Sequence, residues 1–227
     1  MLAAAHCPLL NLGAGLLCLA LVHPAAFAQV LVASNLNQPV TGGFLAGRDP
    51  VGFTYWRANE FTTDAYEYSL ASITLDLGNA MSDGGGFGVA IYTSASGNPG
   101  NPVPNGFLSG TSRPTPSGLY TYTPSSALHL SANTSYYLYT FSYVTTGYFL
   151  LGTASDAQTG PWTLGDSHKL SMNGGATWTD DPASMRFSIS ATAIPELPSG
   201  PLVVSCSLGL VAGVRRWQQR KLRASGQ

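Results

Sequence analysis

The region from residue 29 to residue 194 is built from short runs in which apolar and polar residues alternate. Phe87, Val89 and Ile91 are separated by single residues, and Gly, Pro, Asn and Ser bound most of the runs. A period of two places successive side chains on opposite faces of a β-strand. Because no helical periodicity longer than two turns interrupts these runs, the region is predicted to be all-β.

About nine or ten short strands fit this pattern. They are expected at Val30–Val32, Tyr66–Leu70, Ile73–Leu77, Phe87–Ile91, Leu119–Thr123, Leu128–Leu130, Tyr136–Tyr143, Tyr148–Leu151, Lys169–Met172 and Met185–Ile189. Their number and spacing predict an antiparallel β-sandwich, jelly-roll-like, rather than a closed barrel. Residues 94–118 hold five of the 15 prolines and no strand-length apolar run, which predicts a long surface loop.

The N-terminal segment, residues 1–28, has the features of a secretory signal peptide. Leu9–Val22 is a largely apolar run of the length typical of such signals and too short to span a bilayer comfortably. Ala26 and Ala28 are the small residues of a cleavage site, which predicts a mature chain starting at Gln29. Because no Lys or Arg precedes the apolar run, an N-terminal membrane anchor and a wrongly assigned start codon stay open as alternatives.

The C-terminal segment, residues 195–227, has three parts. A Pro-containing extended linker is followed by the apolar stretch 202–214 and then by a basic cluster that opens with Arg215 and Arg216. An apolar stretch followed directly by positive charge is typical of a stop-transfer signal. The stretch would extend only about 20 Å as a helix, against a hydrocarbon core of about 30 Å, so transient insertion is expected. An amphipathic helix packed on the domain is the alternative.

The linker reads Pro195-Glu196-Leu197-Pro198. Together with the signal peptide, the β-rich region, the short apolar helix and the terminal arginines, it resembles the PEP-CTERM sorting signal of Gram-negative bacteria. Leu197 stands where that family has its second proline. The resemblance implies recognition by an exosortase-type processing enzyme, passage through the inner membrane, and a location at the cell surface or in an exopolysaccharide matrix.

Charged residues and cysteines are distributed unevenly between the terminal segments and the region 29–194. All three cysteines lie in the terminal segments, so the exported domain is expected to fold without disulfides. Residues 29–194 carry five basic against ten acidic residues, a net of −5, although the whole chain has a formal net charge of −1. A mildly acidic, sparsely charged domain argues against nucleic acid as a partner.

The domain itself resembles the choice-of-anchor R family. The residues that carry this resemblance are, in order, Phe61–Thr63, Tyr68–Leu75, Val89–Thr93 and Leu128–Tyr137. It implies an exported β-sandwich joined to an anchor, and it implies no particular reaction.

Residues suited to catalysis are few in the predicted domain. His129 and His168 are its histidines, and no Gly-x-Ser-x-Gly motif accompanies them. A carboxylate pair for glycoside hydrolysis would have to come from acids near the strands. These acids are Glu60, Asp64, Glu67 and Asp76. We therefore expect no catalytic residues and no enzyme activity, with a glycoside-hydrolase-like enzyme as the less favoured alternative.

Metal and cofactor sites are not expected either, because regular ligand spacings for zinc or calcium are absent. A structural Ca²⁺ near Asp180 and Asp181, or near Asp83, is the weaker alternative.

Aromatic residues provide the candidate binding site. Trp56, Trp162 and Trp178 could stack on sugar rings, and Trp162 is expected to be the most exposed because it lies in a loop. The segment Ser171–Trp178 resembles an Asp-box with Asn173 at the acidic position, which predicts a tight hairpin whose tryptophan packs onto the sheet. The sequence thus favours an exported, non-enzymatic surface or matrix protein. A carbohydrate-binding module for exopolysaccharide is the alternative.

Overall fold

The computed structural model describes residues 28–49, 51–80, 86–142, 147–153, 157–182 and 184–195. This part of the chain is all-β, with antiparallel ladders between its strands and no helix. The strands are β1 (Val30–Ser34), β2 (Gly42–Arg48), β3 (Thr54–Thr62), β4 (Tyr68–Ala80), β5 (Phe87–Ala95), β6 (Asn98–Ser109), β7 (Gly118–Pro124), β8 (His129–Leu130), β9 (Ser135–Ser142), β10 (Gly147–Thr153), β11 (Thr163–Ser171), β12 (Thr179–Asp180), β13 (Ser184–Met185) and β14 (Phe187–Ala193).

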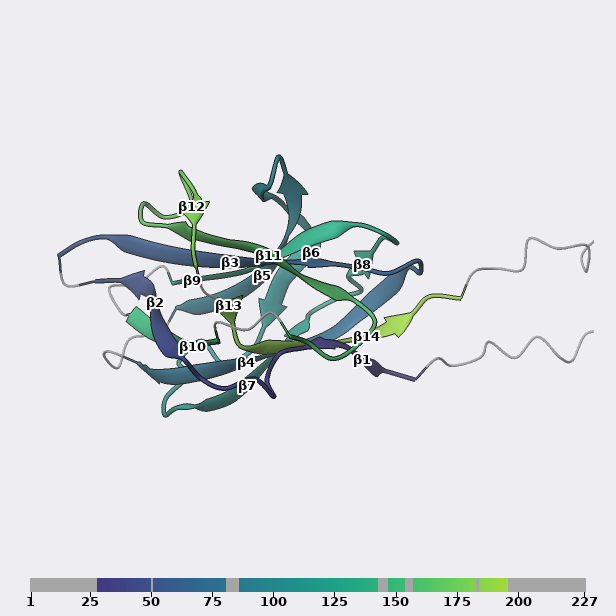
Figure 1. Cartoon of the computed structure of the whole chain (residues 1–227), viewed down its shortest axis with the longest axis horizontal. Coiled ribbons are helices and arrows are strands. Elements are labelled where there is room, and N and C mark those ends of the chain that lie inside the picture. The colour runs from purple at the N-terminus through teal and green to yellow at the C-terminus, as the bar shows by residue number, and fades with distance from the viewer. Residues whose placement is uncertain are drawn as a thin grey trace, which may run out of the picture. The chain divides into compact units, whose positions relative to one another are not determined.

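Eight strands close into a barrel in the order β4-β7-β6-β5-β9-β3-β2-β10, and β10 returns to β4 (Figure 1). The prediction of an all-β antiparallel fold is confirmed, but the prediction of a sandwich rather than a closed barrel is wrong. The physical reason is the length of β4, which has 13 residues. One of its edges pairs first with β14 and then, through Leu77↔Leu150, with β10, so that this single long strand closes the ring.

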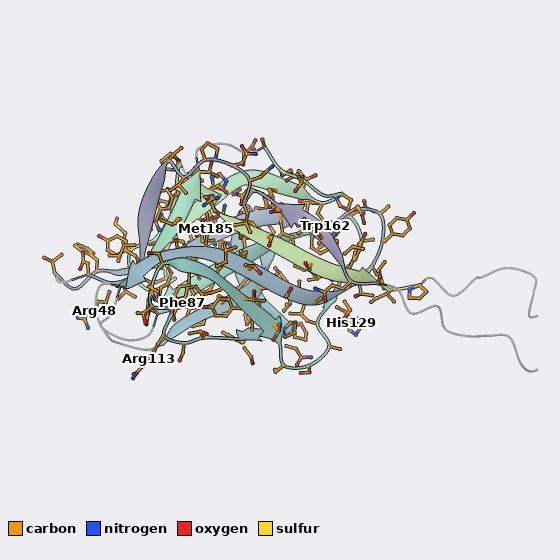
Figure 2. All side chains as sticks on the ribbon, turned by 90° about the horizontal axis from the view of Figure 1, so that it is seen from below. Arg48, Phe87, Arg113, His129, Trp162 and Met185 are labelled. Carbon is orange, nitrogen blue, oxygen red and sulfur yellow. The ribbon has the colours of Figure 1, made fainter. Side chains whose placement is uncertain are left out.

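Two groups of strands extend from this ring. β14 pairs with β4 and carries β1 on its other side, while β11 pairs with β3 and carries β12. Because Val30 of β1 pairs with Ala191 of β14, the chain enters and leaves the domain at the same end. The opposite end holds Arg48, the turn between β2 and β3, and the β11–β12 hairpin. Figure 2 shows Arg48 and His129 at opposite ends of the barrel.

The barrel interior contains the main hydrophobic core. Strand alternation points Phe87, Val89 and Ile91 inward, and Trp162 and Met185 are also buried (Figure 2). All of these side chains except Phe87 have an exposed fraction of at most 1%. The described part of the domain is therefore held by apolar burial.

The region 94–118 differs from its expected loop. It contains the whole of β6, a 12-residue strand with prolines at 99, 102 and 104. β6 pairs with β5 through an interrupted register and meets β7 only at Leu108 and Ser109. Proline lacks an N–H and is therefore tolerated in such an edge-like, irregular strand. The prediction of a long surface loop is wrong for this stretch.

Two ion pairs fasten the segment before β14 to the barrel. Arg57 on β3 binds Asp181, and Arg186 binds Asp76 on β4. The side chains of Arg57 and Asp181 are only 11% and 8% exposed. Burial lowers the pKa of Arg57 to about 10, so its guanidinium stays charged at neutral pH.

An uncharged network continues inside the barrel beside these ion pairs. Asn59 Nδ2 donates to Ser184 Oγ at 2.7 Å, and Asn35 Nδ2 donates to the Met185 carbonyl at 2.8 Å. Asn35 Oδ1 also accepts the backbone N–H of Phe187 at 2.7 Å. Buried polar groups of this kind are tolerated because each is hydrogen-bonded.

Buried tyrosines make the stability of the fold sensitive to alkaline pH. Burial raises the pKa of Tyr68, Tyr122, Tyr137 and Tyr148 above the ordinary value of 10.0. A phenol that holds its proton more tightly when folded stabilises the fold while it is protonated, and this contribution is lost as the pH rises above about 10.

We expect the free energy of unfolding, measured with urea, to fall steadily above pH 10. A Tyr122→Phe variant should show a shallower decline, and a flat profile would contradict this explanation.

The chain divides into two units, Met1–Ala193 and Ile194–Gln227, and the described strands all belong to the first. Several sequence predictions fall on residues outside the described ones. These are the signal peptide with Ala26, the linker residues Glu196, Leu197 and Pro198, the apolar stretch 202–214, Arg215 and Arg216. Within the described ranges, no helix is long and apolar enough to cross a membrane.

Candidate functional site

The strand β9 is apolar on both of its faces. Tyr136 and Leu138 point into the barrel core, whereas Tyr137, Tyr139 and Phe141 belong to a second hydrophobic group on the outside of the wall. Seven of the eight residues of β9 are buried, which requires that something covers each face. The outer face of β9 is thus the centre of a second, external cluster.

Six rings on this outer face contact one another, and we call them the outer aromatic cluster. Its rings come from five strands or turns and are Trp56, Tyr92, Phe107, Tyr139, Phe141 and Trp178. Tyr139 is central to the cluster. Its ring lies 4.4 Å from that of Tyr92 in a stacked arrangement, 5.4 Å from Trp56 and 5.5 Å from Trp178, each edge-on. Such offset and edge-to-face geometries are the favoured ones for aromatic pairs.

Exposure varies across the cluster. Tyr139 and Phe141 are 3% and 5% exposed, while Phe107 at the far edge is 49% exposed. Trp56, Tyr92 and Trp178 are half-buried. The cluster therefore has a covered base and a rim of ring edges that solvent or a ligand can reach.

Two glycines allow the rings to lie this close to the backbone. A Cβ on Gly88 would lie 2.4 Å from the ring of Phe141. A Cβ on Gly175 would lie 2.6 Å from the ring of Trp56, and Gly175 also has a φ of +85°, which favours glycine. The turn and the close approach at these two positions require the absence of a side chain.

The β11–β12 hairpin, residues 171–178, covers one side of the cluster and has the predicted turn. Asn173 Oδ1 accepts the backbone N–H of Thr177 at 2.9 Å, and Asn173 Nδ2 donates to Thr177 Oγ1 at 2.9 Å. Ser171 Oγ accepts the N–H of Gly175 at 2.7 Å. Side-chain to backbone bonds of this kind fix the turn and deliver Trp178 onto Tyr139. The predicted hairpin is confirmed.

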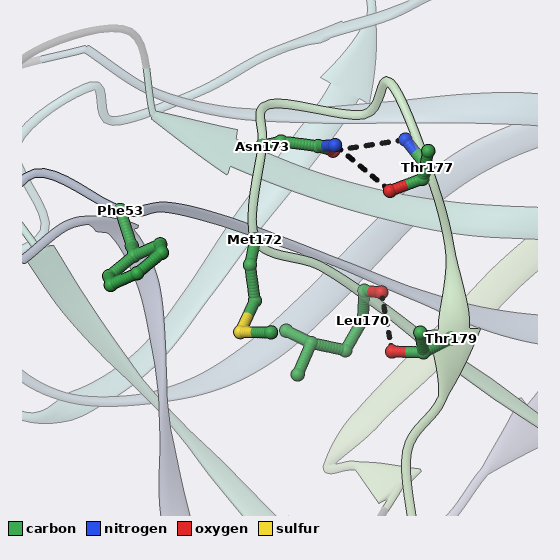
Figure 3. Close-up of a pocket in the computed structure, with 6 residues that line it drawn as sticks. All are labelled: Phe53, Leu170, Met172, Asn173, Thr177 and Thr179. Carbon is green, nitrogen blue, oxygen red and sulfur yellow. Dashed lines mark hydrogen bonds between the residues drawn. The ribbon is translucent and has the colours of Figure 1, made fainter.

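A hollow of about 290 Å³ lies beside the same hairpin. We call it the hairpin pocket, and Figure 3 shows the residues that line it, which are Phe53, Leu170, Met172, Asn173, Thr177 and Thr179. Leu170 pairs with Arg57, whereas Ser171 pairs with Trp56 of the outer aromatic cluster. The pocket and the cluster therefore use opposite faces of β11.

Charge near the outer aromatic cluster is sparse. Lys169 and Asp180 form an ion pair on neighbouring strands, and Glu60 accepts a hydrogen bond from Ser94 Oγ at 3.4 Å. Tyr137 donates its hydroxyl to the Gly97 carbonyl at 2.8 Å. The surroundings of the rings are thus polar, with charges that nearly cancel.

The three tryptophans singled out from the sequence lie in two different places. Trp56 and Trp178 are both in the outer aromatic cluster. Trp162 is 0% exposed and stacks on Phe61, with centroids 5.6 Å apart, inside the barrel. The expectation that Trp162 is the most exposed of the three rings is wrong. Its loop is hydrogen-bonded to β1, because the backbone N–H of Trp162 donates to the Val32 carbonyl at 3.0 Å.

Sequence reasoning did not identify four further members of the cluster. Tyr139 and Phe141 lie in the strand expected at Tyr136–Tyr143, Tyr92 directly follows the one expected at Phe87–Ile91, and Phe107 lies in the stretch expected to be a loop. For Tyr139 and Phe141 the signal is the sequence of β9, in which aromatic residues occupy positions 137, 139 and 141 on one face while Tyr136 and Leu138 lie on the other. A strand with no polar face must be covered on both sides.

The candidate catalytic groups are dispersed and mostly bound to structural partners. His129 is exposed in β8, and His168 is 7% exposed in β11. Asp76 binds Arg186, and Asp64 accepts the Tyr68 hydroxyl at 3.0 Å. Glu67 is exposed before β4.

Two of the acids considered as calcium ligands are also bound to structural partners. Asp180 binds Lys169, and Asp181 binds Arg57. Across the described ranges, no group of three or more His, Cys, Asp or Glu side chains could hold a metal ion. Asp83 lies outside those ranges.

The fold and site together define an antiparallel β-barrel that carries an aromatic cluster on its outer wall. No protein-family model matches the chain, and a search of curated proteins finds no match.

Proposed function

We propose that this chain is an exported, non-enzymatic surface or matrix protein whose barrel binds polysaccharide through the outer aromatic cluster. The observation that carries the proposal is the partly covered ring cluster, with Phe107 exposed at its rim. Aromatic faces and edges flanked by hydroxyl and amide groups suit sugar rings, which present both C–H surfaces and hydroxyls. Because few charged groups surround the rings, we expect the polysaccharide to be uncharged.

Export and sorting rest on the terminal segments. The pairing of β1 with β14 supports this part of the proposal, because Val30 and Ala191, each close in sequence to a predicted cleavage site, are partners on neighbouring strands. Processing at both ends by a signal peptidase and an exosortase-type enzyme would release the barrel without cutting a strand. Transient insertion of residues 202–214 in the inner membrane precedes the second cleavage.

The proposal is tested on the secreted form, whose intact mass should correspond to a chain from Gln29 to about Pro195. This form should be retained on exopolysaccharide immobilised from the producing cells. Phe107→Ala, which removes the exposed rim ring, should weaken retention about tenfold, equivalent to about 1.4 kcal/mol.

Leu119→Ala is the matched control, because Leu119 is apolar and 62% exposed but lies on β7, outside the outer aromatic cluster. Its retention should equal that of the unaltered chain. Failure of the unaltered chain to bind, or equal losses in both variants, would overturn the polysaccharide assignment.

A further inference from the structure

The hairpin pocket has one apolar wall. Phe53 and Met172 are 52% and 47% exposed, and Met172 lies between Phe53 and Leu170 (Figure 3). Large apolar side chains that remain half-exposed beside a hollow provide contact area for a ligand.

The facing wall is polar and fixed in orientation. Asn173 donates through Nδ2 to Thr177 Oγ1 at 2.9 Å, so the Thr177 hydroxyl is the acceptor in this bond and keeps its own proton to donate (Figure 3). Thr179 Oγ1 donates to the Leu170 carbonyl at 3.2 Å, which leaves its oxygen able to accept. The wall thus offers a hydroxyl donor and a hydroxyl acceptor side by side.

Two further features restrict the ligand. None of the six lining residues is charged. A volume of about 290 Å³ lies at the lower limit of small-molecule sites, so it suits a single ring rather than an extended chain. The pocket also lies at the barrel end opposite to the β1–β14 pairing of Val30 with Ala191.

We propose that the hairpin pocket binds one neutral sugar residue. The C–H face of the ring packs on Phe53 and Met172, and its hydroxyls bind Thr177 and Thr179. This inference rests on the proposed function in one respect, namely that the ligand of the barrel is carbohydrate. The site is separate from the outer aromatic cluster, because the two use opposite faces of β11.

The test is an NMR titration of the ¹⁵N-labelled chain with methyl β-glucoside, methyl β-galactoside and N-acetylglucosamine, and with glucuronate as the charged comparison. At least one neutral sugar should shift the amide signals of residues 172–179 and saturate in the millimolar range. Glucuronate should bind more weakly, because its carboxylate finds no cation in the pocket.

Phe53→Ala should weaken the neutral sugar about tenfold, and Thr177→Val should weaken it through loss of the hydroxyl. Val51→Ala is the matched control, since Val51 is 79% exposed on the same turn but does not line the pocket. Absence of hairpin shifts with all three neutral sugars, or equal losses in Phe53→Ala and Val51→Ala, would overturn the inference. Phe107→Ala should leave this titration unchanged, so failure of polymer retention and failure of the pocket are distinguishable.

Discussion

Trp162→Ala is expected to lower the free energy of unfolding by about 3–5 kcal/mol, the range for removing a buried large aromatic side chain. Trp162 is 0% exposed, stacks on the ring of Phe61 and meets Tyr68 edge-on at 5.0 Å. A cavity at this position would remove both ring contacts. Since domains of this size are stabilised by about 5–15 kcal/mol, this loss removes a large share of the total stability. Urea denaturation followed by circular dichroism measures the change.

Tyr66→Ala is the control for this substitution, because Tyr66 is also aromatic but 57% exposed. It should change the free energy of unfolding by less than about 0.5 kcal/mol. A Trp162→Ala variant as stable as the unaltered chain would contradict the buried position of Trp162.

Arg57→Met is expected to cost about 3–5 kcal/mol, because it removes one partner of a buried ion pair. The Asp181 carboxylate would then stay in the interior without the Arg57 charge, and the Leu45 carbonyl would lose the Arg57 Nε–H donor at 3.0 Å. The guanidinium also lies 4.8 Å from the centre of the Phe44 ring. The same urea measurement reports the loss.

The double variant Arg57→Met with Asp181→Leu separates charge burial from packing. Replacing both partners by apolar residues is often neutral, so the double variant should recover most of the stability lost in Arg57→Met. A double variant no more stable than the single one would show that the pair contributes through its shape rather than its charge.

The sequence pattern predicts the class of fold, because period-two alternation reports directly on which face of a strand is buried. It does not predict β3, whose inward row includes Arg57 and Asn59. These polar residues are accepted in the interior only because Asp181 and Ser184, more than a hundred positions later, reach them. Partners that distant in sequence leave no local signal.

Closure of the barrel is likewise non-local. It depends on one edge of β4 pairing with two strands, β14 and β10, and alternation within β4 does not show this. The candidate binding residues are likewise only partly predictable from the sequence. Trp56 and Trp178 could be proposed from residue type alone, but the burial of Trp162 follows from hydrogen bonds between its loop and β1.

The most direct test of the account follows the indole N–H signals of the tryptophans by NMR while soluble fragments of the polysaccharide are added. We expect the signals of Trp56 and Trp178, in the outer aromatic cluster, to shift and saturate, while that of Trp162 in the barrel core stays in place. Saturable binding that leaves Trp56 and Trp178 unchanged would contradict the assignment of the outer aromatic cluster as the polysaccharide-binding surface.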